Sequence, residues 1–194
     1  EEMLKYISYT LLATTSSLFP FSKNKVEIPV NVSNGESGVL HLIFEAGLLY
    51  QYLSFKVESH KSSRTLSPLK MSILTYTSQQ LRHYVGFVND VTISGHMRSL
   101  KATYLVLYDQ ILIFRFYYSF IQRFDQFRGD QFLSEFDSLR HHGDPLISSL
   151  SNNIFQSLII LYYEYLTNWL TKGQLDATYK EFFIEAGEIN NTDD

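Results

Sequence analysis

Apolar residues recur at steps of three and four through most of this chain, the spacing that places side chains on one face of an α-helix. The pattern is strongest over residues 100–127, where two neighbouring apolar stripes cover roughly 200° of a helix with 3.6 residues per turn. So wide an apolar surface has to be covered by other helices or by a partner protein. The sequence therefore predicts an all-α fold, an antiparallel helical bundle of five to six helices.

Helix-breaking and helix-capping residues set the expected boundaries. Pro20 and Pro29 interrupt helices, and an alternation of apolar residues starts at Val26, so residues 18–35 are expected to form a short extended hairpin or loop. The expected helices run from Leu4 to about Thr15, from Ser37 as N-cap to about Val57, from Ser67-Pro68 to Val91, from Leu100 to Phe127, from Gly129 to Leu139, and from Asp144-Pro145 to Gly173. Gly47 falls inside the second of these, and we expect another helix to approach it closely. A single domain over residues 1–194 is expected.

Composition narrows the classes of function. The chain has no cysteine, which argues against a disulfide-linked secreted protein and favours the cytosol or nucleus. A formal net charge of -4 without a basic cluster disfavours nucleic acid as a partner. The apolar stretches fall short of the roughly 20 residues that a membrane-spanning helix needs, so no membrane partner is expected.

Two groups of polar residues have spacings that could place metal ligands together. His41 and Glu45 lie four residues apart on the second expected helix. The His141-His142 pair lies between Asp137 and Asp144. Neither group completes a site, so a surface ion pair and a solvated turn are the favoured interpretations. No phosphate-binding loop, nucleophile elbow or paired carboxylate motif is visible, and we expect neither enzyme activity nor a cofactor.

Several segments of the chain form a recognisable set. They are Leu18 to Phe21, Glu36 to Tyr50, Tyr84 to Asp90, and the run from Gly143-Asp144 to Gly173. A closing pattern follows at Trp169, Gly173, Tyr179, Glu181, Phe182, Phe183 and Ile184. Together these segments resemble the gamma-tubulin complex component family, most closely the branch of its third component in budding yeasts, the spindle pole body component of the small gamma-tubulin complex. One departure is Ala177-Thr178, where many relatives have Asp-Pro.

The resemblance implies a scaffold rather than an enzyme. It covers essentially all of the chain but only the N-terminal conserved half of the family, so we expect the chain to be part of a longer protein. In this family gamma-tubulin is held by the C-terminal domain, which the chain lacks. The implied partners are a paralogous gamma-tubulin complex component, packed laterally, and a coiled-coil receptor at the spindle pole. The implied location is the cytoplasm, cytoskeleton and spindle pole body, with the nucleus also compatible.

Aromatic and arginine side chains are enriched in protein interfaces, and they supply most candidate contacts for the lateral partner. The candidates are Arg115, Tyr117, Phe120 and Arg123 on the fourth expected helix, with His41 and Glu45 on the second. For each aromatic residue the core is the favoured competing position, and Trp169 is likewise expected in the core. A second hypothesis is a helical adaptor that binds a coiled-coil receptor peptide in an inter-helix groove. A third, a metal-dependent helical enzyme, requires bound metal in the purified protein.

Overall fold

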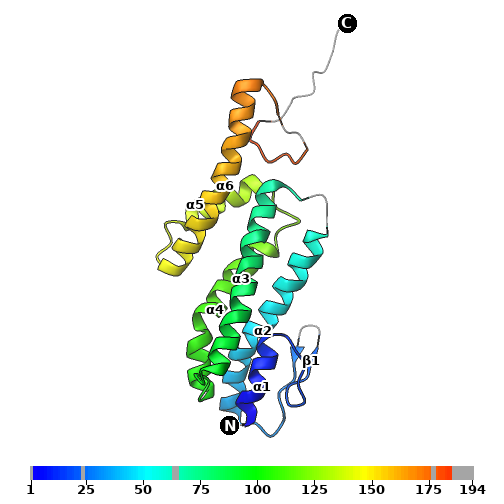
Figure 1. Cartoon of the computed structure of the whole chain (residues 1–194), viewed down its shortest axis with the longest axis vertical. Coiled ribbons are helices and arrows are strands. Elements are labelled where there is room, and N and C mark those ends of the chain that lie inside the picture. Colours follow the sequence, from blue (N-terminus) through cyan, green and yellow to red (C-terminus); the bar gives the residue numbers. More distant parts are fainter. Residues whose placement is uncertain (1, 23–24, 63–65, 176–177, 185–194) are drawn as a thin grey trace. The chain divides into compact units, whose positions relative to one another are not determined.

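The computed structural model describes residues 2–22, 25–62, 66–175 and 178–184. These residues form six α-helices and one short hairpin (Figure 1), which confirms the predicted all-α fold. The helices are α1 (Glu2–Leu11), α2 (Asn34–Lys61), α3 (Pro68–Ile93), α4 (Leu100–Ile121), α5 (Gly129–Leu139) and α6 (Pro145–Lys172). Strands β1 (Phe21–Ser22) and β2 (Lys25–Val26) pair antiparallel.

The chain folds into two compact units. Unit 1 comprises Glu1–Ser62 and Tyr76–Gln122, and unit 2 comprises Ser63–Thr75 and Arg123–Asp194. Helix α3 therefore contributes its first residues to unit 2 and its remaining residues to unit 1. The assignment of residues 1–194 to a single domain stays a prediction.

Unit 1 is built on α2, α4 and the larger part of α3, which run in alternating directions (Figure 1). Aromatic rings from the three helices meet at its centre: Tyr84 lies 4.6 Å from Phe114 and 5.4 Å from Tyr50 between ring centroids. The Tyr84 hydroxyl donates a hydrogen bond of 3.2 Å to the carbonyl oxygen of Leu11 at the end of α1. This bond ties the first helix to the aromatic centre of the unit.

The predicted hairpin within residues 18–35 is confirmed, although each strand has only two residues. Phe21 lies opposite Val26 in the ladder. Phe19, just before β1, is fully buried, and its ring packs edge-on against Phe44 of α2 at 4.8 Å. The apolar alternation after Val26 does not extend the strand, because Val30 is fully exposed in a turn.

Proline fixed two helix starts as predicted, at Pro68 and Pro145. The predicted N-cap at Ser37 is wrong, because α2 begins earlier. The Ser33 hydroxyl accepts a hydrogen bond from the Glu36 backbone N–H, and the Glu36 carboxylate accepts one from the Ser33 backbone N–H. This reciprocal capping box starts the helix at Asn34.

Two predicted helix ends are also wrong. Helix α1 ends at Leu11 rather than near Thr15, because Ala13 adopts a left-handed conformation with φ of 55°. Helix α4 ends at Ile121 rather than Phe127, and the chain turns so that the Phe127 N–H donates to the Arg123 carbonyl at 3.0 Å. The apolar spacing continues past this end because the aromatic residues of the turn pack within unit 2.

Unit 2 is built on α5 and α6 together with the start of α3. Phe124 from the turn after α4 packs against Phe132 of α5, with ring centroids 5.6 Å apart. Asp144 caps α6 by accepting the Leu146 N–H at 2.9 Å, and Gly173 ends the helix with φ of 62°, both as predicted. The unit thus has a long helix with defined ends, and the C-terminal half of this helix carries Trp169.

Candidate interaction sites

The first candidate site is an ion pair between α4 and α2 in unit 1. Arg115 Nε lies 2.5 Å from Glu45 Oε1, and Arg115 Nη2 lies 2.6 Å from Glu45 Oε2. Hydrogen bonding to Glu45 raises the pKa of Arg115, so the guanidinium is charged at every physiological pH. The Arg115 side chain is 53% exposed, and such surface pairs contribute only about 0–1 kcal/mol to stability. The pair is accessible, and the fold depends little on it.

Exposed apolar side chains lie on the same two helices as this ion pair. Leu105, Tyr108 and Arg115 follow the helical spacing along α4, and Leu42 lies one turn before Glu45 on α2. Leu105 is 62% exposed and Tyr108 is 46% exposed. We call these five residues the α2–α4 face. A group of exposed apolar and aromatic residues around an arginine is typical of a protein interface.

Tyr117 and Phe120, two of the predicted contact residues, lie in the core of unit 1. Their exposed fractions are 3% and 1%, and burial raises the pKa of the Tyr117 hydroxyl. The Phe120 ring packs edge-on against Phe116 at 5.0 Å. Both residues therefore occupy the competing position, the core, and their contact with a partner stays a prediction.

The sequence predicted Arg123 on the same helix as Arg115. This prediction is wrong, because α4 ends at Ile121, before Arg123. It belongs to unit 2, where its Nη2 lies 2.7 Å from Glu135 Oε1 of α5. Its guanidinium also lies over the Phe127 ring at 4.8 Å. With its side chain 26% exposed, Arg123 fastens the turn after α4 to α5.

The residues considered as metal ligands are dispersed. His41 is exposed and lines a hollow with Val26, Ile28 and Val30, whereas Glu45 is turned to Arg115. No group of three or more histidine, cysteine, aspartate or glutamate side chains is placed to hold a metal ion within the described ranges. In the same ranges, no helix combines the length and apolarity of a membrane span.

The acidic and histidine residues around the start of α6 have other roles. Asp137 pairs with Arg140 at 2.9 Å, and Asp144 caps α6. The His142 Nδ1 accepts the backbone N–H of Asp144 at 3.0 Å. The favoured interpretation, a capped and solvated turn, describes this arrangement.

The second candidate site is the segment of residues 178–184, which we call the strap. It lies beside the end of α6 (Figure 1), and two of its residues, Glu181 and Phe182, are buried. The Phe182 ring lies 5.6 Å from Tyr162 and 6.1 Å from Trp169. The Phe183 ring lies 6.4 Å from Trp169, although Phe183 is 63% exposed. Three residues of the closing sequence pattern, Trp169, Phe182 and Phe183, thus meet in space.

Trp169 was expected in the core, and this expectation is wrong in degree because the residue is half-buried. Its aromatic neighbours, Phe182 and Phe183, belong to the strap. Tyr179 of the same pattern is also half-buried. Of the Ala177-Thr178 pair, where the chain departs from the family pattern, Ala177 lies outside the described residues and Thr178 is in a turn.

The Glu181 carboxylate holds the strap to three helices of unit 2. Its Oε2 accepts the backbone N–H of Leu69 at the start of α3 and the hydroxyl of Tyr165 on α6, each at 3.3 Å. The Ser67 hydroxyl also donates to the carboxylate. Oε1 accepts no hydrogen bond from the described residues and lies against Gly129 of α5, where an added Cβ would overlap it. Only glycine fits beside this carboxylate.

Burial and hydrogen bonding act in opposite directions on the pKa of Glu181. Burial raises the pKa of the carboxyl above its ordinary value. The hydrogen bonds from Ser67, Leu69 and Tyr165, together with the positive charge of Lys70, favour the ionised form and oppose the shift. Each of these neighbours is a hydrogen-bond donor or a cation and therefore favours a carboxylate at this position. Burial alone opposes the ionised form.

The free energy that holds the strap is small. Burying Phe182 stabilises by about 1.5–3 kcal/mol. Against this, a buried oxygen without a donor costs about 1–3 kcal/mol, as Glu181 Oε1 does. Lys180 adds a cost of about 1–2 kcal/mol because it adopts a left-handed conformation with φ of 51°. These two costs are similar in size to the gain from burying Phe182, so the strap also needs its hydrogen bonds to stay in place.

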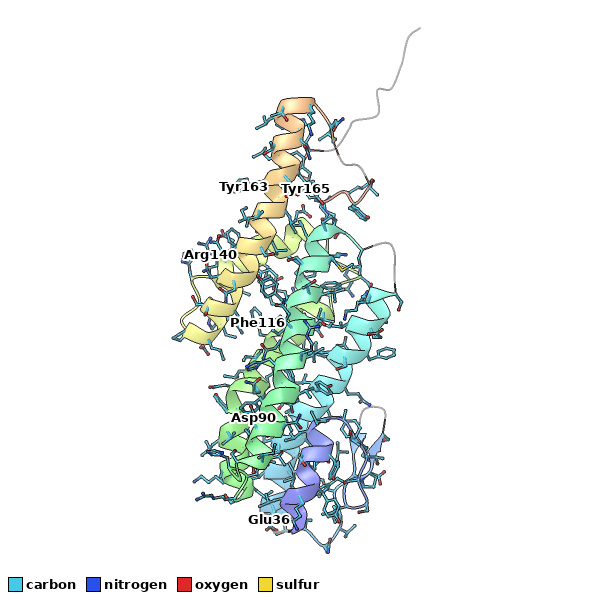
Figure 2. All side chains as sticks on the ribbon, in the orientation of Figure 1. Glu36, Asp90, Phe116, Arg140, Tyr163 and Tyr165 are labelled. Atoms are coloured by element: carbon cyan, nitrogen blue, oxygen red, sulfur yellow. The ribbon has the colours of Figure 1, made fainter. Side chains whose placement is uncertain are left out.

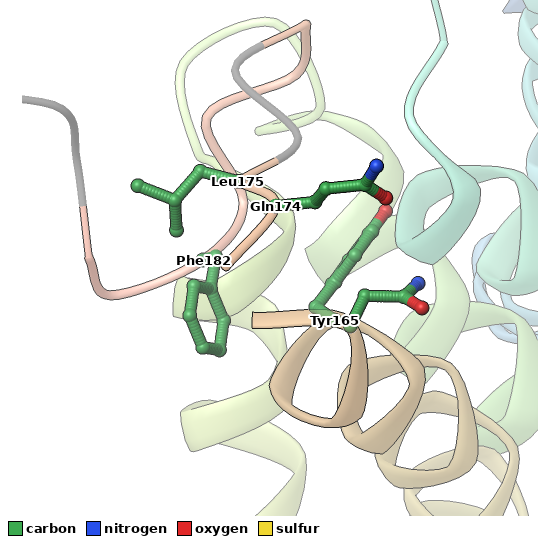
Figure 3. A pocket seen from close by; sticks show the side chains of 5 residues that line it. Tyr165, Gln174, Leu175 and Phe182 are labelled. Carbon is green, nitrogen blue, oxygen red and sulfur yellow. The ribbon is translucent and has the colours of Figure 1, made fainter. Parts of the chain in front are cut away.

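A hollow lies beside the contact between the strap and the last turns of α6. Figure 3 shows Tyr165, Gln174, Leu175 and Phe182 around it. Its volume is about 370 Å³, and Asn168 completes the lining. The side chains of Tyr165 and Phe182 therefore have one surface in the hollow and one in the contact between strap and helix.

The sequence model described as "Gamma tubulin complex component N-terminal" matches residues 4–194. The chain belongs to this family. It is 50% identical over 195 residues to spindle pole body component SPC98 of Saccharomyces cerevisiae, across 100% of this chain and 23% of that protein. Spindle pole body component alp6 of Schizosaccharomyces pombe is 46% identical over 44 residues, across 23% of this chain and 5% of that protein.

Spindle pole body component 98 of Dictyostelium discoideum is 34% identical over 61 residues, across 31% of this chain and 8% of that protein. The chain thus spans less than a quarter of the length of the curated relatives it matches. The family resemblance inferred from the sequence motifs is confirmed.

Proposed function

We propose that this family member is a scaffold domain that packs laterally against a paralogous gamma-tubulin complex component. We also propose that the domain takes part in attachment to the spindle pole body, where the assembled components position gamma-tubulin for microtubule nucleation. Family membership supports the proposal, and the relatives SPC98 and alp6 are named as spindle pole body components. A scaffold acts through the shape and adhesion of its surfaces, so it needs no reactive group.

The α2–α4 face is the observation that carries the lateral contact. Tyrosine and arginine are the side chains most often responsible for binding energy, and the face presents Tyr108 and Arg115 next to exposed leucines. Glu45 holds the guanidinium in one orientation, which lowers the entropy lost when a partner binds it. A stable contact should bury at least about 1,000 Å² in total.

Reversing the charge of Arg115 should weaken this contact without unfolding the chain. For Arg115→Glu we expect at least a roughly tenfold loss of affinity for the matching N-terminal region of a paralogous component, which corresponds to about 1.4 kcal/mol. The free energy of unfolding should fall by no more than about 1 kcal/mol, because the ion pair is exposed. Isothermal titration calorimetry and urea denaturation measure the two effects.

The double variant Glu45→Arg with Arg115→Glu separates fold from recognition, because it restores an intrachain ion pair of opposite polarity. Its stability should return to that of the unchanged chain while its affinity stays low. Arg82→Glu, which reverses an exposed charge on α3, serves as the matched control and should bind normally. Unchanged affinity in Arg115→Glu would remove the α2–α4 face from the lateral contact.

The chain by itself should not bind gamma-tubulin. In this family the C-terminal domain holds gamma-tubulin, and the chain matches the N-terminal family region. When the two purified proteins are sedimented together, the sedimentation profile of gamma-tubulin should be the same as that of gamma-tubulin alone. A shared peak at micromolar concentration would contradict the assignment of gamma-tubulin binding to the C-terminal domain of the family.

A second candidate function is an adaptor for a coiled-coil receptor peptide at the spindle pole. The hollow between the segment after β2 and α2 favours it, because apolar Val26, Ile28 and Val30 line it beside the polar His41. Titration with receptor coiled-coil fragments, in parallel with the region of the paralogous component, distinguishes the two functions. Charge reversal at Arg115 should weaken binding of the paralogous component and leave binding of the receptor fragments unchanged.

A further inference from the structure

We propose that the strap is a displaceable cover over an aromatic stripe on α6, and that Glu181 is the anchor that keeps it closed. The stripe consists of Tyr162, Tyr165 and Trp169, which follow the helical spacing along one side of the helix. The Phe182 ring packs against all three. The inference concerns unit 2 alone and does not depend on the lateral contact proposed above.

The opposite side of α6 is already bare. Ile160, Tyr163 and Leu170 are 60%, 57% and 67% exposed. Tyr163 and Tyr165 lie on opposite sides of the helix (Figure 2). From Ile159 to Lys172 no residue of α6 is fully buried. Removing the strap would therefore expose a second group of apolar side chains on this half of the helix, beside Ile160, Tyr163 and Leu170.

Glu181 is suited to be the anchor because it joins the strap to elements far away in the sequence. The carboxylate reaches Leu69 on α3, Gly129 on α5 and Tyr165 on α6. A second polar contact joins the Phe183 backbone N–H to the Tyr162 hydroxyl. No other charged side chain of the strap is buried, since Lys180 is exposed. Loss of the carboxylate would remove the hydrogen bonds that join the strap to Leu69 and Tyr165.

Three features make the closed strap easy to displace. Oε1 of Glu181 is buried without a donor among the described residues, and Lys180 is held in a left-handed conformation. Phe183 remains mostly exposed although it touches Trp169. In segments with such a balance, local opening occurs more often than global unfolding.

The chain contains built-in reporters for strap opening. Trp169 is the one tryptophan in the sequence, and it contacts the strap directly. Its fluorescence should become accessible to iodide when the strap opens. Lys180 lies on the strap itself, so trypsin cleavage after this residue follows the population of the open form when opening is fast.

The test compares Glu181→Ala and Gly129→Ala with the unchanged chain. The first removes the anchor, and the second places a methyl group where the carboxylate lies. Both should increase iodide quenching of Trp169 and accelerate cleavage after Lys180 by about tenfold or more, while far-UV circular dichroism keeps its helical signal. Glu181→Gln, which keeps the shape and one acceptor, should stay protected. Glu164→Ala, an exposed position on α6, is the matched control and should behave like the unchanged chain.

Two results would overturn the proposal. Equal protection of Lys180 in Glu181→Ala and in the unchanged chain would show that the carboxylate is not the anchor. Loss of helical signal, or simultaneous cleavage throughout residues 123–175 in both alanine variants, would show that Glu181 supports the folding of unit 2 as a whole and that the strap does not open separately.

Discussion

Phe114→Ala should lower the free energy of unfolding by about 3–5 kcal/mol, the range found when a large aromatic side chain is removed from a packed core. Phe114 is fully buried in unit 1, where its ring lies 4.6 Å from Tyr84 and 6.4 Å from Tyr50. The three rings come from α4, α3 and α2, so the cavity would open where all three helices meet. Rigid helices cannot collapse around such a cavity without losing other contacts.

Urea denaturation followed by circular dichroism measures the effect of Phe114→Ala. The chain offers a matched control in Phe55→Ala on α2, because the Phe55 side chain is 70% exposed. This second variant removes the same atoms and should change stability by no more than about 0.5 kcal/mol. Similar losses in the two variants would show that burial does not determine the cost, contrary to the packing of unit 1.

The helices that proline opens were predictable because proline restricts the backbone directly. Pro68 and Pro145 fix φ at the first helical position, and the structure has both helices starting there. The Ser33 capping box was also present in the sequence, but the prediction placed the N-cap at Ser37. The observed helix includes both Gly35 and Gly38. A reciprocal cap outweighs the helix propensity lost at those glycines.

The end of α4 could not be predicted from apolar spacing. Spacing reports which side chains are buried and does not report the path of the backbone. Phe124 is buried as the pattern requires, yet it lies in a turn and packs on Phe132 in unit 2. The prediction that Arg123 lies on the same helix as Arg115 was wrong for this reason.

The sequence identified several residues of the candidate sites, but it did not show which of them contact one another in space. Glu45 and Arg115 were both named, but the 70 residues between them hide their pairing until the helices are packed. Glu181 was identified through the family pattern alone. Its role depends on Leu69 and Gly129, and neither has a spacing relation to the strap that a sequence reveals.

Gly47→Ala should destabilise the chain by about 1–3 kcal/mol, the usual cost of overpacking a tight contact. The expectation that another helix approaches this glycine closely is confirmed: a Cβ at position 47 would overlap the carbonyl oxygen of Thr10 on α1. The obstructing atoms belong to the backbone, so no side chain can rotate away. Helix α1 would have to move, which would also disturb the hydrogen bond from Tyr84 to Leu11.

Gly86→Ala is the matched control for this contact. Gly86 lies within α3 and has open space where its Cβ would be. The same substitution should therefore stabilise the chain by about 0.5–1 kcal/mol, because alanine loses less backbone entropy than glycine in a helix. Thermal and urea unfolding of the two variants should shift in opposite directions. If Gly47→Ala also stabilised the chain, the close approach of α1 to position 47 would not require glycine there.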